Sequence, residues 1–216
     1  MTSLPLKVAA DNAEHLVSTY TRNPWEWQKR VRELAKIEKN KAPDMGTKVH
    51  SMIENYFKWE MCDRGHDFYV DDEYIVVMKA LEGFIKENKI LPKSEEYLEK
   101  VVVNHDTKDA GTLDFKGKAW GCNRVYIDWK TQNIKKGKPN FYQDWGLQLA
   151  QYCASDNNNT IPDDARCFNV VISTAGFGVK DYKPDIHVKE WKNLSALKET
   201  FDKVSGLFFT MLEGIE

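Results

Sequence analysis

The chain has 216 residues, of which 42% are hydrophobic and 30% charged, so it can bury a core and differs from a disordered chain. This length predicts one domain, and the formal net charge of −2 excludes a protein that is basic over its whole surface. The four cysteines have no CxxC spacing, which favours free thiols in a reducing compartment over a zinc ribbon or a disulfide scaffold.

The first 90 residues are predicted to be mainly helical. The first residues contain no apolar run typical of a signal peptide, and no stretch is long enough to span a membrane, so a soluble cytoplasmic protein is expected.

Three helices are predicted in this part of the chain. A charged helix is predicted over Trp25–Glu38, after Pro24. Asp44 can cap a second helix that runs through Val49 to Phe57. Asp71 or Asp72 can cap a third, with Tyr74, Met78, Leu81 and Ile85 at helical spacing.

The pattern changes to strands after residue 90. Three strands are predicted, separated by polar turns: Tyr97–Val103, Gly111–Ala119 and Arg124–Thr131. They are followed by a helix over Tyr142–Ala154, strands over Phe168–Ser173 and Val179–Val188, and a last helix over Glu190–Leu212. This order predicts an α/β fold with a central mixed sheet flanked by helices. We expect one domain over residues 1–216, with residues 1–43 as a helical N-terminal elaboration and residues 44–216 as its core.

The sequence YIDWKT places Asp128 and Lys130 two residues apart on a predicted strand. Side chains alternate along a strand, so these two share a face, whereas Trp129 points into the opposite layer. Asp114 lies on the preceding strand, and a short connection over residues 116–123 can bring it beside Asp128. Two clustered carboxylates repel each other, which favours a hard divalent cation as their partner.

Phosphodiester hydrolysis needs such a set of groups. A metal activates water and neutralises charge on the phosphate, and Lys130 can orient the water or stabilise the transition state. The ordinary alternative is that Asp128 and Lys130 form a solvated pair on an exposed strand, since the DxK tripeptide is common. Glu99, at the start of the first strand, can add a third acidic group or can be a surface charge.

Two helices add pairs of polar residues at a spacing of four, which places each pair on one helical face. His50 and Glu54 form the first pair, and Gln148 and Tyr152 the second. A histidine on a helix is more often structural than a ligand, and the second pair alone is typical of the edge of a core. Gln148 and Tyr152 can also hydrogen-bond to a phosphate or to the lysine.

Together these residues resemble the RecB-like branch of the PD-(D/E)xK nucleases. That pattern is GxxxH on a helix, then Glu, GxxD, DxK, and QxxxY on a following helix. The sequence supplies all five motifs in this order, over about half of the chain: Gly46 with His50, Glu99, Gly111 with Asp114, Asp128 with Lys130, and Gln148 with Tyr152. The stretches GTKVHSMIE, YIDWKT and LQLAQY are most similar to the mitochondrial genome maintenance exonuclease and its phage and bacterial relatives.

The resemblance implies a restriction-endonuclease-like core and a DNA exonuclease that depends on Mg²⁺ or Mn²⁺. Metal ligands would be His50, Asp114 and Asp128, with the Trp129 carbonyl as an extra ligand. Asp114, Asp128 and Lys130 would be catalytic, with Glu99 and then Glu54 as further candidates. Gln148 and Tyr152 would contact DNA. Some relatives hold an iron–sulfur cluster, but Cys62, Cys122, Cys153 and Cys167 lie at the wrong places for one, so none is expected. If the protein is phage-encoded, it acts in the host cytoplasm.

The N-terminal stretch TYTRNPWEWQKRVRE interleaves aromatic and cationic residues, among them Arg22, Trp25 and Arg30. This pattern suits a single DNA strand that enters by a free end, in replication, recombination or repair. Packing of the tryptophans against the core explains it equally well. A structure-specific or restriction-type endonuclease remains an alternative, as does a DNA-binding subunit with a decayed nuclease site. Trp120, Trp145 and Trp191 are interpreted as core aromatics without a role.

Overall fold

A computed structural model describes residues 45–62, 68–105, 107, 109–134, 137–175 and 183–213. The chain divides into two compact units, Met1–Val49 and His50–Glu216, and every contact below lies within the second unit. The predicted helix over Trp25–Glu38, the capping residue Asp44 and the proposed elaboration over residues 1–43 lie outside the described residues.

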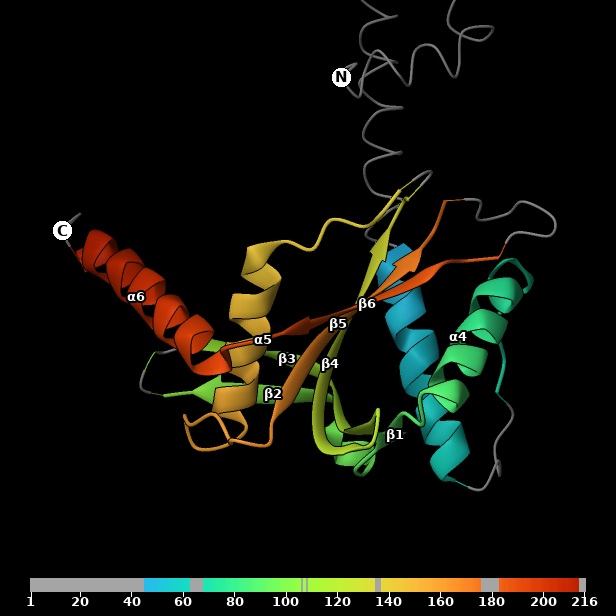
Figure 1. Ribbon diagram of the computed structural model, residues 1–216, viewed down its shortest axis with the longest axis horizontal. Helices are drawn as coiled ribbons and strands as arrows, with labels where there is room; N and C mark the ends of the chain where they lie inside the picture. Colours follow the sequence, from blue (N-terminus) through green and yellow to red (C-terminus); the bar gives the residue numbers. More distant parts are fainter. Residues whose placement is uncertain are drawn as a thin grey trace, which may run out of the picture. The chain divides into compact units, whose positions relative to one another are not determined.

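Strands and helices follow one another as an α/β chain (Figure 1). The strands are β1 (Leu91–Pro92), β2 (Leu98–Asn104), β3 (Asp109–Ala119), β4 (Cys122–Gln132), β5 (Arg166–Ser173) and β6 (Ile186–Trp191). The helices are one over residues 45–61, α4 (Ile75–Glu87), α5 (Gln143–Ser155) and α6 (Leu194–Glu213), with short 3₁₀ turns η1 (Asp72–Tyr74) and η2 (Glu95–Tyr97).

The six strands form one mixed sheet in the order β1-β3-β4-β5-β6, with β2 also paired to β3. All pairs are antiparallel except β4 with β5, which is parallel and joins Asp128 to Asn169 in register. A parallel pair needs a crossover connection, and α5 lies within the connection between β4 and β5. The predicted central mixed sheet with flanking helices is confirmed.

The β3–β4 hairpin closes through a two-residue turn, Trp120–Gly121, between the paired residues Ala119 and Cys122. Both turn residues have positive φ, 49° and 76°, as a tight hairpin turn requires. Trp120 is an unusual residue for this conformation, and contacts hold it there. Its indole N–H donates to Asn88 at 2.8 Å, and its ring lies 4.3 Å from that of Phe168. The expected connection over residues 116–123 is therefore mostly strand.

Helices cover both faces of the sheet (Figure 1). On one face, α5 contributes Leu149, Ala150 and Cys153 to a buried cluster with Leu113 and Tyr126. On the other, Phe57 of the helix over residues 45–61 lies 5.2 Å from Phe115 of β3, between ring centroids. The burial of Met52, Ile53, Tyr56 and Phe57 follows the helical period. Among the described helices, none is both long and apolar enough to cross a membrane.

Two predicted boundaries were wrong. The strand expected over Val179–Val188 is β6, Ile186–Trp191, and residues 176–182 lie outside the described part. Glu190 and Trp191 were assigned to the last helix, but they pair with Phe168 and Cys167 of β5, so α6 begins only at Leu194. Asp71 or Asp72 was expected to cap α4, yet the residue at its N-cap is Tyr74. Asp72 lies within η1, and the Asp71 side chain makes no capping hydrogen bond to η1.

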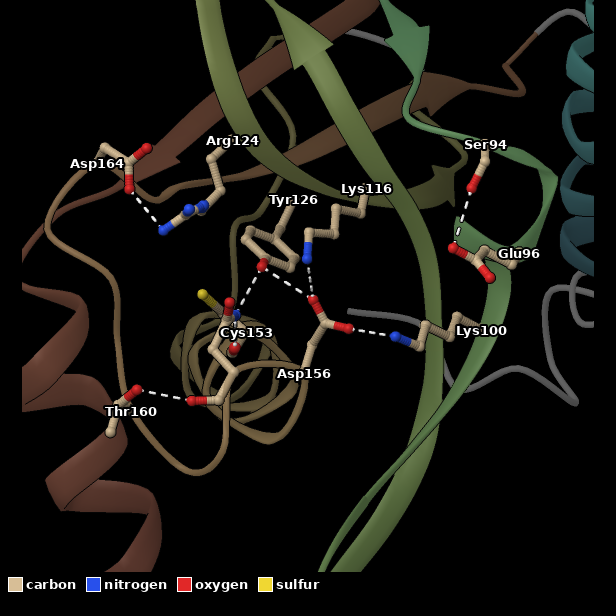
Figure 2. A network of polar contacts seen from close by, with 11 residues as sticks. Ser94, Glu96, Lys100, Lys116, Arg124, Tyr126, Cys153, Asp156, Thr160 and Asp164 are labelled. Atoms are coloured by element: carbon tan, nitrogen blue, oxygen red, sulfur yellow. Dashed lines mark hydrogen bonds and ion pairs between the residues drawn. The ribbon is translucent and has the colours of Figure 1, made fainter.

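A buried carboxylate at the end of α5 joins this helix to three strands (Figure 2). The Asp156 side chain is only 1% exposed, and it forms ion pairs with Lys100 of β2 and Lys116 of β3. Tyr126 of β4 donates its hydroxyl to the same carboxylate at 3.1 Å. Burial alone would raise the pKa of Asp156, but the hydrogen bonds from the two lysines outweigh it and lower the pKa. This Asp156 network therefore contributes stability in the ionised state.

We expect Asp156→Asn to lower the free energy of unfolding by about 3 kcal/mol at neutral pH, because two lysines lose their partner. A folded-state pKa below the unfolded value means that the contribution is present at neutral pH and disappears as the pH falls below about 4. The wild-type advantage should shrink accordingly in acid. Urea unfolding at several pH values measures this.

The matched control is Asp164→Asn, because Asp164 pairs with Arg124 at 2.7 Å but is 64% exposed. This change should alter stability by less than about 0.5 kcal/mol. Equal losses in the two variants would contradict the assigned role of Asp156.

Candidate metal and catalytic site

The site begins where β3 and β4 separate. Their backbone pairing ends at Phe115 and Ile127, so the next residues of the two strands are not joined by a ladder. The Trp129 N–H instead donates to the Asp114 carboxylate, Oδ2, at 2.8 Å. Asp114 is thereby held beside the strand that carries Asp128 and Lys130, with only 9% of the residue exposed.

Asp128 lies on β4 and is held by two donors. Lys130 Nζ approaches Oδ1 at 2.8 Å, and Asn169 Nδ2 donates to Oδ2 at 2.5 Å. Asp128 is 4% exposed, whereas the Lys130 side chain is 23% exposed and so reaches the surface of the site. The alternative of a solvated Asp–Lys pair on an open strand is wrong, because the carboxylate is buried.

Glu99 is directed to the site by an unusual backbone conformation. Its φ is 49°, in the left-handed region that a residue with a long side chain rarely adopts. The flanking residues Leu98 and Lys100 pair with Phe115 and Leu113, whereas Glu99 itself has no partner in the register. Backbone strain of this kind costs about 1–3 kcal/mol and is concentrated at functional sites.

His50, on the helix over residues 45–61, lies next to Glu99 and Asp114. Its Nδ1 lies 3.5 Å from Asp114 Oδ2 and 3.9 Å from Glu99 Oε1. One ligand atom each from His50, Glu99 and Asp114 lies within 4.8 Å of the others. An imidazole nitrogen with carboxylate oxygens is a donor set that suits Mn²⁺ and other divalent cations, and Mg²⁺ takes carboxylates with water. The residues therefore fit a divalent metal.

The Gln148–Tyr152 pair lies on α5 beside these carboxylates. Gln148 Nε2 donates to the Tyr152 hydroxyl at 2.8 Å. The Tyr152 ring packs directly on Gly111 of β3, and a Cβ at that position would collide with it. This contact explains physically why glycine stands three residues before Asp114. Burial raises the pKa of Tyr152, and the charges of Asp128 and Asp114 raise it further.

The crowding of carboxylates is costly in the absence of a cation. Burial and repulsion from Asp128 raise the pKa of Asp114 to about 8, against the lowering effects of His50 and the Trp129 N–H. Burial likewise raises the pKa of Asp128, although Lys130 and Asn169 oppose it. Both carboxyl groups thus favour a bound proton, or a cation that replaces it.

The pKa values of the two basic groups are raised as well, which favours their charged form. Burial lowers the pKa of His50, but the carboxylates of Glu99 and Asp114 raise it more. Burial also lowers the pKa of Lys130, and attraction to Asp128 outweighs that effect, so the pKa rises. Lys130 therefore remains a cation at neutral pH and provides a fixed positive charge at the rim of the site.

Three residues near the site were not identified from the sequence. Asn169 of β5 orients Asp128, and the indole N–H of Trp191 donates to Asn169 Oδ1 at 2.6 Å, which sets the direction of the amide. Lys130 Nζ lies 5.7 Å from the ring centroid of Trp145. Trp145 and Trp191 were interpreted as core aromatics without a role. The only available signal was Asn169, a polar residue in the apolar stretch CFNVVIS.

Of the other side chains predicted for the site, only that of Glu54 is described, and it is not part of this group. Glu54 forms an ion pair with Lys58 at 2.8 Å, on its own helix. Arg22, Trp25 and Arg30 lie outside the described residues. The Trp129 carbonyl stays a predicted ligand.

A scan against protein-family models returns no match for this chain. A search of curated proteins likewise returns no match.

We expect Trp191→Phe to weaken the binding of Mn²⁺ by about 10-fold, because partners that orient a ligating carboxylate typically carry such an effect. Without the indole N–H, Asn169 can rotate and Asp128 loses a donor. Calorimetric titration with Mn²⁺ measures the affinity. Trp120→Phe is the matched control, since it also removes an indole hydrogen bond, to Asn88, but away from the site. Equal affinities in the two variants would refute the orienting role.

Asp114→Asn should stabilise the metal-free protein while abolishing its stabilisation by Mg²⁺ or Mn²⁺. The folded-state pKa of about 8 exceeds the unfolded value of about 4, so wild-type stability falls as the pH rises through this interval. The asparagine avoids this loss and can still accept the Trp129 N–H.

Thermal unfolding in chelator should place the variant about 3 °C or more above wild type at pH 8, with a smaller difference at pH 5. Asp163→Asn, at an exposed position, is the control and should behave as wild type. A variant that is still stabilised by the metal would remove Asp114 from the ligand set.

Proposed function

We propose that this protein is a metal-dependent DNA nuclease that hydrolyses phosphodiester bonds. The observation that carries the proposal is the convergence of His50, Glu99 and Asp114 within 4.8 Å, beside the Asp128–Lys130 pair. Hydrolysis of a diester requires neutralisation of a charged phosphate and activation of water. An acidic group that fits a cation, next to a lysine that stays protonated, provides both requirements.

His50, Glu99 and Asp114 would hold the metal together with Asp128, which lies close enough to Asp114 to raise its pKa. When bound, a divalent cation supplies Lewis-acid polarisation of the phosphate and a lower pKa for water. Asn169 and the Trp129 N–H keep the two aspartates in place through hydrogen bonds. The ligands are thus preorganised by neighbouring strands, which reduces the cost of binding.

Lys130 performs the role of a fixed donor. Its ammonium group is anchored on Asp128 Oδ1, and its partial exposure lets it reach a phosphate oxygen or the attacking water. A preorganised donor of this kind stabilises the charge that develops in the transition state. The Tyr152 hydroxyl and Gln148 amide, on the same side of the sheet, can donate to the DNA backbone.

The resemblance of the sequence to RecB-like nucleases points to the PD-(D/E)xK core and to action at DNA ends. The β3–β4 hairpin, the parallel strand β5 and the crossover helix α5 support that core, since they bring the separate motifs into one group. We therefore propose an exonuclease with a preference for single strands, with Mg²⁺ or Mn²⁺ as the cofactor.

Cleavage of labelled DNA should require Mg²⁺ or Mn²⁺ and stop on chelation. Lys130→Ala should reduce the rate by on the order of 10²-fold or more while metal affinity is retained, because a transition-state donor is lost but the ligands remain. Lys118→Ala, at an exposed position of β3, is the matched control and should cleave at the wild-type rate.

The substrates in this assay are linear and covalently closed strands of one sequence. An exonuclease cuts only the linear form, whereas equal cleavage of the circle would favour an endonuclease on the same core. Undiminished cleavage in excess chelator would refute the metal-dependent function altogether.

A further inference from the structure

The residues that lead into α5 expose an aromatic ring next to the catalytic group. Tyr142, the residue before α5, is 51% exposed. Its ring meets that of Trp145 in a T-shaped contact, with centroids 5.1 Å apart. The backbone N–H of Trp145 donates to the backbone carbonyl of Tyr142 at 3.3 Å, which holds the two residues together. The exposed Tyr142 ring thus packs against the partly buried ring of Trp145.

This aromatic pair lies beside the lysine of the site. Lys130 Nζ is 5.7 Å from the Trp145 ring centroid and 2.8 Å from Asp128 Oδ1. A phosphate bound at Lys130 would therefore have the Tyr142–Trp145 pair next to it. The distance from Lys130 Nζ to the Trp145 ring is of the order of the separation between a base and the phosphate of the same nucleotide.

A second lysine lies on the same face of the sheet. Asp128 pairs with Asn169 across β4 and β5, and Asn169 pairs with Lys189 across β5 and β6. Two strand spacings separate Asp128 from Lys189, or about 10 Å. Lys189 Nζ is 4.1 Å from the Trp191 ring centroid and 5.8 Å from that of Phe141. Within the described part of the chain, no carboxylate forms an ion pair with Lys189.

Proteins bind single-stranded nucleic acid by combining exposed aromatic rings with nearby cations. Each stacked base contributes about 1–3 kcal/mol, and the cations contact the phosphates. Bases inside a duplex are stacked on each other and cannot use such a ring. The Tyr142–Trp145 pair therefore suits an unpaired base, and Lys130 and Lys189 suit its flanking phosphates.

We propose that Tyr142, supported by Trp145, stacks an unpaired base next to the phosphate at the metal site, and that Lys189 contacts a neighbouring phosphate. This inference rests on the proposed nuclease function and deepens it. It names the residues that select single-stranded substrate.

The test measures binding separately from cleavage. Fluorescence anisotropy with a labelled oligothymidine, in chelator so that no turnover occurs, compares wild type with Tyr142→Ala and Tyr142→Phe. Tyr142→Ala should weaken binding by about 10-fold, and Tyr142→Phe should retain it, because stacking needs the ring and not the hydroxyl. Tyr69→Ala is the matched control, since Tyr69 is 79% exposed and outside the site; it should bind as wild type.

An abasic strand of the same length distinguishes stacking from a structural effect. Wild type and Tyr142→Ala should bind it equally, whereas Lys189→Ala should weaken both the abasic and the normal strand because its contact is with phosphate. An equal loss on the abasic strand in Tyr142→Ala would overturn the proposal. Oligouridine forms a second arm, and an equal loss there extends the stacking to RNA.

The two proposals fail in different ways. If wild type cleaves DNA with Mg²⁺ and Tyr142→Ala binds oligothymidine as tightly as wild type, the stacking inference alone is overturned. If wild type cleaves no DNA under any metal, the nuclease function is refuted, and with it the placement of the base beside a reacting phosphate.

Discussion

The arrangement of the site follows from the burial of two carboxylates on neighbouring strands. Asp114 and Asp128 are almost inaccessible to water, and each raises the cost of ionising the other. Such a pair persists in a fold only if the surroundings compensate for it. Here compensation comes from a backbone N–H, a lysine and an asparagine, each on β4 or β5. A bound divalent cation would compensate for the remaining cost of ionising both carboxylates.

Backbone strain is found at the same place. Glu99 has a positive φ although the strand around it pairs regularly with β3, so one residue of β2 is turned out of the ladder to bring a third acidic group to His50. Strain of this type costs free energy and survives when the neighbouring contacts determine it. Leu98 and Lys100, which flank Glu99, both pair with β3, and Lys100 also forms an ion pair with Asp156.

Helix α5 connects these features because it is anchored at both ends. At its C-terminal end the Asp156 network ties it to β2, β3 and β4. Near its N-terminal end, Trp191 of β6 packs against Gly146. Between the anchors the helix carries Gln148 and Tyr152, and Tyr152 reaches Gly111 on β3. The position of the tyrosine relative to the carboxylates is therefore set by contacts with most of the sheet.

The sequence by itself determined the type and order of the strands and helices from β2 onward, and the residues of the central group, but it missed the short strand β1. Alternation along strands, helical spacing and short turns are local properties, which is why Asp114, Asp128 and Lys130 could be placed together from the sequence. Only the tertiary structure decided which residues surround them. Asn169 lies opposite Asp128 because of the register of a parallel pair, and Trp191 and Trp145 reach the site through packing between elements distant in sequence. The conformation of Glu99 and the true start of α6 also depend on strand pairing, which no local pattern encodes.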